Sequence, residues 1–115
     1  MRRRYKATDG WQIELHPHYK YHPAAYVRVP DFVITRTRYG KEAVIAEAKY
    51  VHELTVGHLE QLLDYYKVFG KIRRGFAIQE IIMLIGPRDH TYVSPEVYEY
   101  AEYSDIEITR LPVYF

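Results

Sequence analysis

The stretch that decides the fold is residues 26–50, YVRVPDFVITRTRYGKEAVIAEAKY. Its two halves, residues 26–37 and 42–50, are rich in Val, Ile, Thr and Tyr, which favour β-strands. Between them, Arg38-Tyr39-Gly40 supplies a three-residue loop with glycine at the position that takes a left-handed backbone conformation. The sequence therefore predicts a β-hairpin with its tip at these three residues.

The length of that loop determines which residues of the two strands face each other. With a three-residue loop, Asp31 lies opposite Glu47, and Lys49 emerges on the same face because side chains alternate along a strand. A two-residue loop would instead pair Asp31 with Ala48 and turn Glu47 and Lys49 to the other face. The predicted cluster of two carboxylates and one ammonium group thus depends on the loop.

Outside the hairpin, the sequence predicts more strands and two helices. Residues 76–85 are almost wholly apolar, as in a strand covered on both faces. Apolar side chains recur at helical spacing through residues 55–69, and Gly70 is a suitable C-terminal cap. In order, the expected elements are strands 11–15, 26–37 and 42–50, helix 55–69, strand 76–85, helix 94–103 and strand 105–111. This order predicts the α/β class, with a mixed β-sheet and flanking helices.

Length and composition fit a single domain, residues 1–115. The chain contains no Cys, which excludes disulfides, thiolate metal sites and cysteine nucleophiles. No apolar run approaches the roughly 20 residues that span a bilayer. We therefore expect a cytoplasmic protein without a membrane partner, and the absence of Asn hints at a thermophile source.

Charge is unevenly distributed, although the net charge is only +1. Residues 1–75 carry 14 basic and 8 acidic side chains, whereas residues 76–115 carry 2 basic and 7 acidic ones. One basic surface of this kind suits binding to a phosphate backbone. The candidate phosphate contacts are Arg36, Arg38, Lys41, Lys71, Arg73 and Arg74.

Asp31, Glu47 and Lys49 carry the chemistry if the three-residue loop is correct. Two adjacent carboxylates in an apolar sheet repel each other and need a cation, and their oxygen atoms favour Mg²⁺ or Mn²⁺. The backbone carbonyl of Ala48 is a suitable third ligand, and Lys49 can position a water that attacks phosphorus. The alternative is that Asp31 merely begins a strand and that Glu47 and Lys49 form a surface ion pair.

The segments Val29-Pro30-Asp31-Phe32-Val33-Ile34 and Ala46-Glu47-Ala48-Lys49 resemble the PD-(D/E)XK nuclease superfamily, also called restriction-endonuclease-like. The resemblance extends over residues 27–85 and implies a restriction-endonuclease-like core. It also implies that Asp31 and Glu47 bind the metal ion and that Lys49 is the catalytic lysine.

A second motif lies in the first predicted helix. Gln61-Leu62-Leu63-Asp64-Tyr65 resembles the QxxxY element of RecB-like and related exonuclease branches. Gln61 and Tyr65 are one turn apart on one helix face, close to His58. The resemblance implies that Gln61 holds a carboxylate or a phosphate and that Tyr65 contacts the DNA backbone. Residues 61–71 are also similar to the helix end of archaeal Holliday-junction resolvases. An ordinary polar boundary of a packed helix is the alternative.

The chain departs from the superfamily before its first strand. The superfamily usually has a helix there, with a glutamate that completes the metal site, and only about ten residues precede the first strand here. Glu14, or less readily Asp9, is the candidate replacement. We therefore expect a restriction-endonuclease-like core with a shortened N-terminus.

These observations favour a Mg²⁺-dependent deoxyribonuclease that acts on DNA as a homodimer, since two strands need two sites. A catalytically silent module of the same fold, which binds DNA or protein, is the first alternative. A structural or interaction subunit with a coincidental motif is the second. The sequence leaves open endonuclease or exonuclease action, DNA or RNA, and a branched or linear substrate.

Overall fold

The computed structural model describes residues 5–15, 32–38, 40–87 and 90–111. Its centre is a five-stranded mixed sheet in the order β1-β2-β3-β5-β7. The elements are the 3-10 helix η1 (Ala7–Asp9), β1 (Gln12–Leu15), β2 (Phe32–Arg36), β3 (Glu42–Lys49), β4 (Glu53–Leu54), α1 (Val56–Ile72), β5 (Ala77–Ile85), β6 (Tyr92–Val93), α2 (Pro95–Tyr103) and β7 (Ile106–Arg110). The predicted α/β class, with a mixed sheet and two helices, is confirmed.

The hairpin between β2 and β3 has the register that a three-residue loop requires. Phe32 pairs with Ala46 and Arg36 pairs with Glu42, and Gly40 adopts a positive φ of 108°. The two-residue loop is therefore excluded. Asp31, and the predicted strand residues that precede it, lie outside the described residues.

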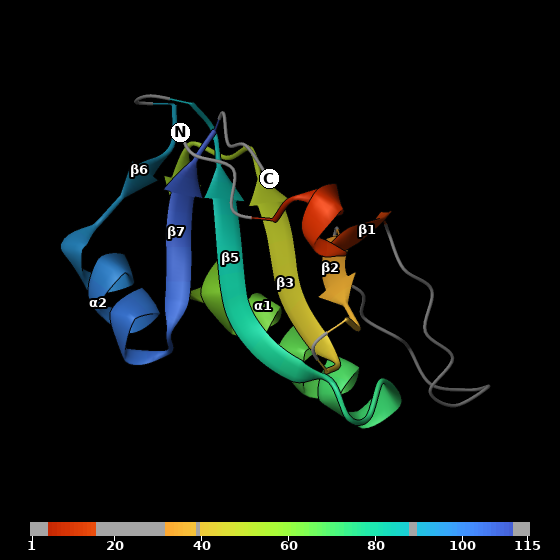
Figure 1. Cartoon of the computed structure of the whole chain (residues 1–115). Helices are drawn as coiled ribbons and strands as arrows, with labels where there is room; N and C mark the ends of the chain where they lie inside the picture. The colour runs from red at the N-terminus through yellow and green to blue at the C-terminus, as the bar shows by residue number, and fades with distance from the viewer. Residues whose placement is uncertain (1–4, 16–31, 39, 88–89, 112–115) are drawn as a thin grey trace.

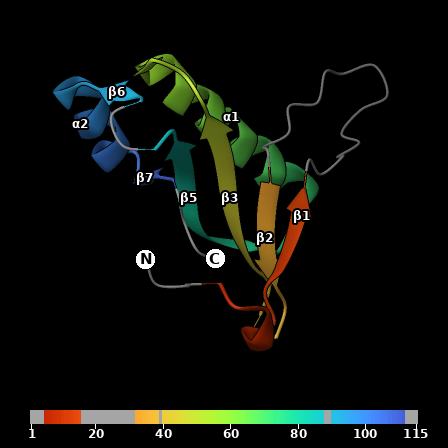
Figure 2. The same cartoon turned by 90° about the horizontal axis from the view of Figure 1, so that it is seen from above.

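The sheet changes from antiparallel to parallel at β3. Strands β1, β2 and β3 are antiparallel neighbours, whereas β3, β5 and β7 run parallel, so their carboxyl ends meet at one edge (Figure 1). Because a parallel connection needs a crossover, α1 links β3 to β5 and α2 precedes β7. Both helices lie on one side of the sheet and η1 lies on the other (Figure 2). Neither α1 nor α2 is long and apolar enough to cross a membrane.

An apolar core lies on each face of the sheet, because residues of β3 alternate between the two. The helix-side core takes Ala43 and Ile45 from β3 and packs them under α1 and α2. The second core takes Val44 and Ala46. Its other members are Tyr5, Trp11, Ile34, Ile82 and Leu84. With both faces covered, β3 is buried continuously from Ala43 to Glu47.

The predicted end of the first helix is wrong. Helix α1 continues through Gly70 to Ile72, and Arg73 is its C-cap residue. The helix tolerates the glycine, which costs about 1 kcal/mol in a helix interior, because Phe69 anchors this turn in the helix-side core. The left-handed glycine is Gly75, with φ of 89°, where the chain turns into β5.

The sequence did not predict the small parallel sheet of β4 and β6. This sheet ties the loop after β3 to the loop after β5. The backbone N–H of Tyr92 donates to the carbonyl of His52 at 2.8 Å, and the hydroxyl of Thr91 donates to the carbonyl of Val51 at 2.6 Å. Thr91 is fully buried. The two loops therefore hold each other at the carboxyl edge of the large sheet.

We expect Thr91→Val to lower the free energy of unfolding by about 1–2 kcal/mol, because the valine keeps the shape but leaves the Val51 carbonyl without its buried donor. Thr91→Ser, which keeps the hydroxyl, is the matched control and should lose less. Chemical denaturation followed by circular dichroism measures both. Equal losses in the two variants would contradict the hydrogen-bond explanation.

Candidate active site

Glu47 and Lys49 lie near the carboxyl end of β3, on its helix-facing side. This follows from alternation, because Ile45 belongs to the helix-side core and Glu47 and Lys49 are two and four residues further on. Glu47 is only 4% exposed, and Lys49 is half-buried. The alternative of a surface ion pair is therefore excluded for Glu47.

Positive charge gathers at the same edge. The sheet register aligns Lys49 with Ile85 of β5, and Ile85 with Arg110 of β7. The three side chains therefore leave the sheet on the same side. Neighbouring strands are about 4.8 Å apart, so the backbones of Lys49 and Arg110 are roughly 10 Å apart.

Of the expected metal ligands, Glu47 and Ala48 lie at this edge, whereas Asp31 lies outside the described residues. Within the described part of the chain, no three His, Cys, Asp or Glu side chains are grouped to hold a metal ion. The Oε2 atom of Glu47 is inaccessible to solvent. A carboxylate in such a place is normally held by hydrogen bonds, an opposite charge or a metal. Its oxygen atoms are the hard donors that Mg²⁺ prefers, so this residue fits the expected ion.

Helix α1 begins at this edge with a capping box made by Thr55 and His58. The His58 backbone N–H donates to the Thr55 hydroxyl at 3.4 Å, and the Thr55 backbone N–H donates to Nδ1 of His58 at 2.9 Å. Since Nδ1 accepts this bond, the neutral ring carries its proton on Nε2. Burial, and secondly the positive charge of Lys49, lower the pKa of His58 from its ordinary value. The two side chains are thus close enough to interact.

Gln61 and Tyr65 follow His58 along α1, toward the amino end of β3. Gln61 is half-buried, and it lies about 4.5 Å beyond His58 along the helix axis. The step from His58 to Gln61 along α1 therefore runs in the same direction as the step from Lys49 to Glu47 along β3. Tyr65 is 9% exposed and packs in the helix-side core. Such burial favours a role in supporting the site over contact with a DNA backbone.

Three side chains with predicted roles are used elsewhere in the fold. Glu14 of β1 forms an ion pair with Arg73, with 3.1 Å between a guanidinium nitrogen and a carboxylate oxygen. Arg73 lies at the end of α1 that is far from Lys49. Arg36 donates to Glu42 at 2.6 Å, and its guanidinium lies 4.3 Å from the Trp11 ring centroid. These contacts compete with the predicted roles of Glu14 as a metal ligand and of the two arginines as phosphate contacts. Asp9, the other substitute acid, is exposed on η1.

The remaining predicted phosphate contacts lie far from the candidate site. Lys41 precedes β3, and Lys71 and Arg74 lie at the end of α1; all three are exposed, as is Arg38 at the hairpin tip. Lys49 stands at the opposite end of β3, whose eight residues span about 25 Å. The basic surface that they form is thus separate from Glu47 and Lys49.

An aromatic cluster beside Lys49 was missed. Tyr50 stacks on His90, and His90 lies 5.4 Å from His52 between ring centroids. Forty residues separate Tyr50 from His90, so no local pattern could have paired them. The available signal was that Tyr50 directly follows the Glu47-Ala48-Lys49 segment.

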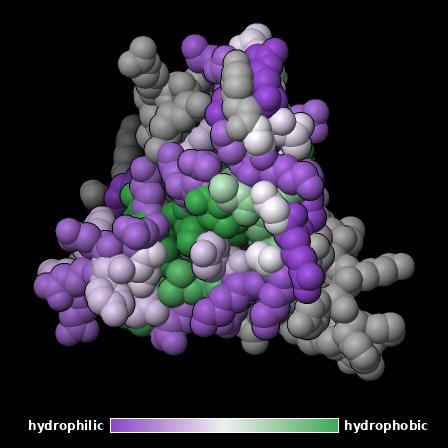
Figure 3. Space-filling view, turned by 60° about the horizontal axis from the view of Figure 1, so that its bottom comes forward, coloured by the Kyte–Doolittle hydropathy of each residue, from purple (hydrophilic) through white to green (hydrophobic). Residues whose placement is uncertain are grey.

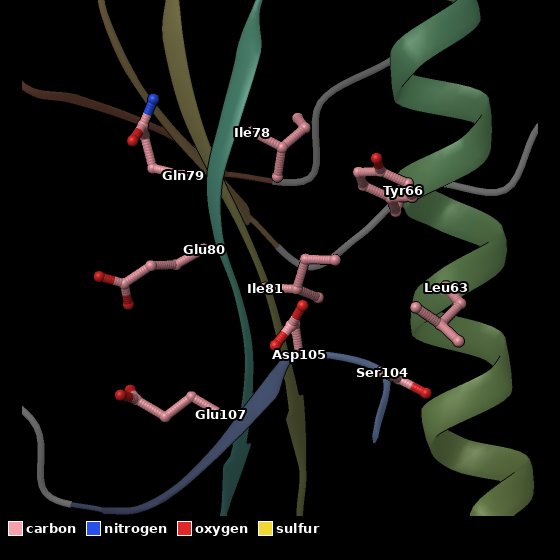
Figure 4. Close-up of a pocket in the computed structure, with 9 residues that line it drawn as sticks. All are labelled: Leu63, Tyr66, Ile78, Gln79, Glu80, Ile81, Ser104, Asp105 and Glu107. Atoms are coloured by element: carbon pink, nitrogen blue, oxygen red, sulfur yellow. The ribbon is translucent and has the colours of Figure 1, made fainter. Parts of the chain in front are cut away.

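A hollow of about 520 Å³ lies at the other end of the sheet, between α1, β5 and the turn into β7. A β-bulge at Gln79 turns both Ile78 and Ile81 toward α1 (Figure 4). Glu80 and Glu107 point to the opposite side of the sheet. The space-filling view shows an apolar patch ringed by hydrophilic side chains on this underside (Figure 3). The hollow contains none of the predicted site residues.

The lowered pKa of His58 predicts that the folded protein becomes less stable as the pH falls. The unfolded chain takes up a proton near pH 6.5, whereas folded His58 resists it, so stability is lost as the pH falls below that value. His58→Gln, which keeps the acceptor of the capping box, should reduce this loss. His52→Gln, which leaves the cap intact, should not. Denaturation at pH 7.5 and pH 5 checks this, and equal slopes for wild type and His58→Gln would contradict it.

No protein-family model matches this chain, and no curated protein or solved structure is significantly similar to it. A function is therefore inferred from the sequence motif and from the positions of the side chains. The strongest structural observation for that inference is that Glu47 is buried near Lys49 at the carboxyl edge of three parallel strands.

Proposed function

We propose that this protein is a Mg²⁺-dependent phosphodiesterase that cleaves DNA, with a site of the PD-(D/E)XK type. The observation that carries the proposal is the position of Glu47 and Lys49. Both lie on the helix-facing side of β3 at its carboxyl end, with the carboxylate buried. The hairpin register supports the proposal, since it is the one that brings Asp31 opposite Glu47 in the sequence prediction.

In this proposal, Asp31, Glu47 and the carbonyl of Ala48 hold the metal ion. When bound, Mg²⁺ supplies positive charge that offsets the charge developing on the phosphate. Lys49 donates a hydrogen bond that orients the attacking water, and its ammonium group stabilises the phosphate oxygens. Gln61 donates from its amide to a carboxylate or phosphate oxygen. Tyr65 fixes the position of this part of α1 by its packing in the helix-side core.

A catalytically silent module that binds DNA or protein is the second candidate. The ion pair between Glu14 and Arg73 favours it, because it engages the acid that would complete the metal site. A module of this kind would keep affinity for DNA without a requirement for metal. The homodimer remains a prediction for either function.

Cleavage of labelled linear duplex, single-stranded and four-way-junction DNA tests the proposal. We expect cutting at elevated temperature with Mg²⁺ or Mn²⁺ and none with EDTA. Lys49→Ala and Glu47→Gln should each lower the rate at least about 100-fold, because each removes a group that acts on the phosphate or the metal.

Lys67→Ala is the matched control, since Lys67 is exposed on α1 away from the sheet. It should cut like the wild type. Circular dichroism must show that Lys49→Ala and Glu47→Gln are folded. Cutting that survives either substitution in a folded protein would refute the proposed site, and metal-independent DNA binding without any cutting would favour the silent module.

A further inference from the structure

Tyr50 presents an aromatic ring to solvent directly after Lys49. The residue is 72% exposed, although one face of its ring stacks on His90. The two ring centroids are 3.8 Å apart and the planes differ by 16°. An exposed side chain normally keeps much of its rotamer freedom, and a parallel stack of this kind restricts the orientation of the open face.

The surrounding fold restricts the position of the His90 ring. His90 lies against Gly86, where an added Cβ would come within 2.7 Å of its Cδ2 atom. A side chain at position 86 would therefore displace the imidazole. The next residue, Thr91, is fully buried and donates to the carbonyl of Val51, which follows Tyr50. Both members of the stack are thus attached to the same hydrogen-bonded pair of loops.

The surroundings suit a negatively charged ligand with a flat ring. Lys49 is the preceding residue, and its half-buried side chain leaves β3 on the helix-facing side. Arg110 lies on the same edge in register with Ile85, the partner of Lys49. His52 adds a third ring, 5.4 Å from His90. An aromatic platform beside basic side chains is the arrangement with which proteins bind single-stranded nucleic acids.

We propose that the Tyr50–His90 stack is a base-stacking platform, which receives an unpaired base of a DNA strand while Lys49 faces the adjoining phosphate. This inference rests on the proposed nuclease function and narrows its substrate to single strands and frayed or branched ends. A base inside a duplex has both faces covered by its neighbours, so only an unpaired or terminal base can offer a face to Tyr50. The platform also requires no particular base, because every base has an aromatic face.

Binding measured in EDTA tests the platform independently of cleavage. Fluorescence anisotropy would compare a labelled 15-nucleotide oligo-dT strand with a blunt duplex of equal length, using the full chain. We expect Tyr50→Ala to weaken binding of the single strand about tenfold or more and to weaken duplex binding less, because a blunt duplex offers Tyr50 only its two terminal base faces. Tyr50→Phe keeps the ring and should bind like the wild type.

Tyr103→Ala is the matched control, because Tyr103 is 89% exposed at the end of α2. It should leave both affinities unchanged. Quenching of a 2-aminopurine base in the strand, lost in Tyr50→Ala and kept in Tyr50→Phe, would show the stacking directly.

Three results would overturn the platform: wild-type protein that does not bind the single strand, Tyr50→Ala that binds it normally, and equal losses for single strand and duplex. The outcome is separable from that of the nuclease proposal. Tyr50-dependent binding without any metal-dependent cutting would uphold the platform and refute the nuclease, whereas cutting that needs Lys49 but not Tyr50 would do the reverse.

Discussion

The parallel pairing of β3 with β5 is the constraint on which the rest of the structure depends. It runs along the whole of β3, from Glu42 to Lys49, and brings the ends of both strands to one edge. It also requires α1 to return across the sheet, which covers one face of β3 and begins the helix beside Lys49. Without this pairing, Glu47 would not be buried and no helix terminus would lie near it.

Backbone pairing and a buried hydrogen bond also connect the loops at that edge. The small β4–β6 sheet and the buried hydroxyl of Thr91 join two loops that are 40 residues apart in the chain. The capping box of Thr55 and His58 then fixes where α1 starts. The proposed site gains from such support, because catalytic side chains act well only when their neighbours restrict their positions.

Local signals in the sequence predicted most of the fold. Gly40 sets the hairpin loop and therefore the register of Glu47, and apolar spacing locates α1 and β5. The same signals failed where tertiary packing determines the local structure. Gly70 reads as a helix end, yet the buried Phe69 carries the helix past it. The β4 and β6 strands have two residues each, too few to show a period. Tyr65 matches a motif by spacing, but spacing alone does not reveal its burial.

The placement of Trp11 has a spectroscopic consequence. It is the only tryptophan in the chain, and it lies in the second core, against Tyr5 and under the guanidinium of Arg36. Intrinsic fluorescence excited at the tryptophan band therefore reports whether the segment around η1 is docked on the sheet. Helix α1 packs on the opposite face of the sheet from Trp11, and the carboxyl edge lies at the end of β3. Emission can thus follow the release of the N-terminal segment as an event distinct from the loss of the helix-side core.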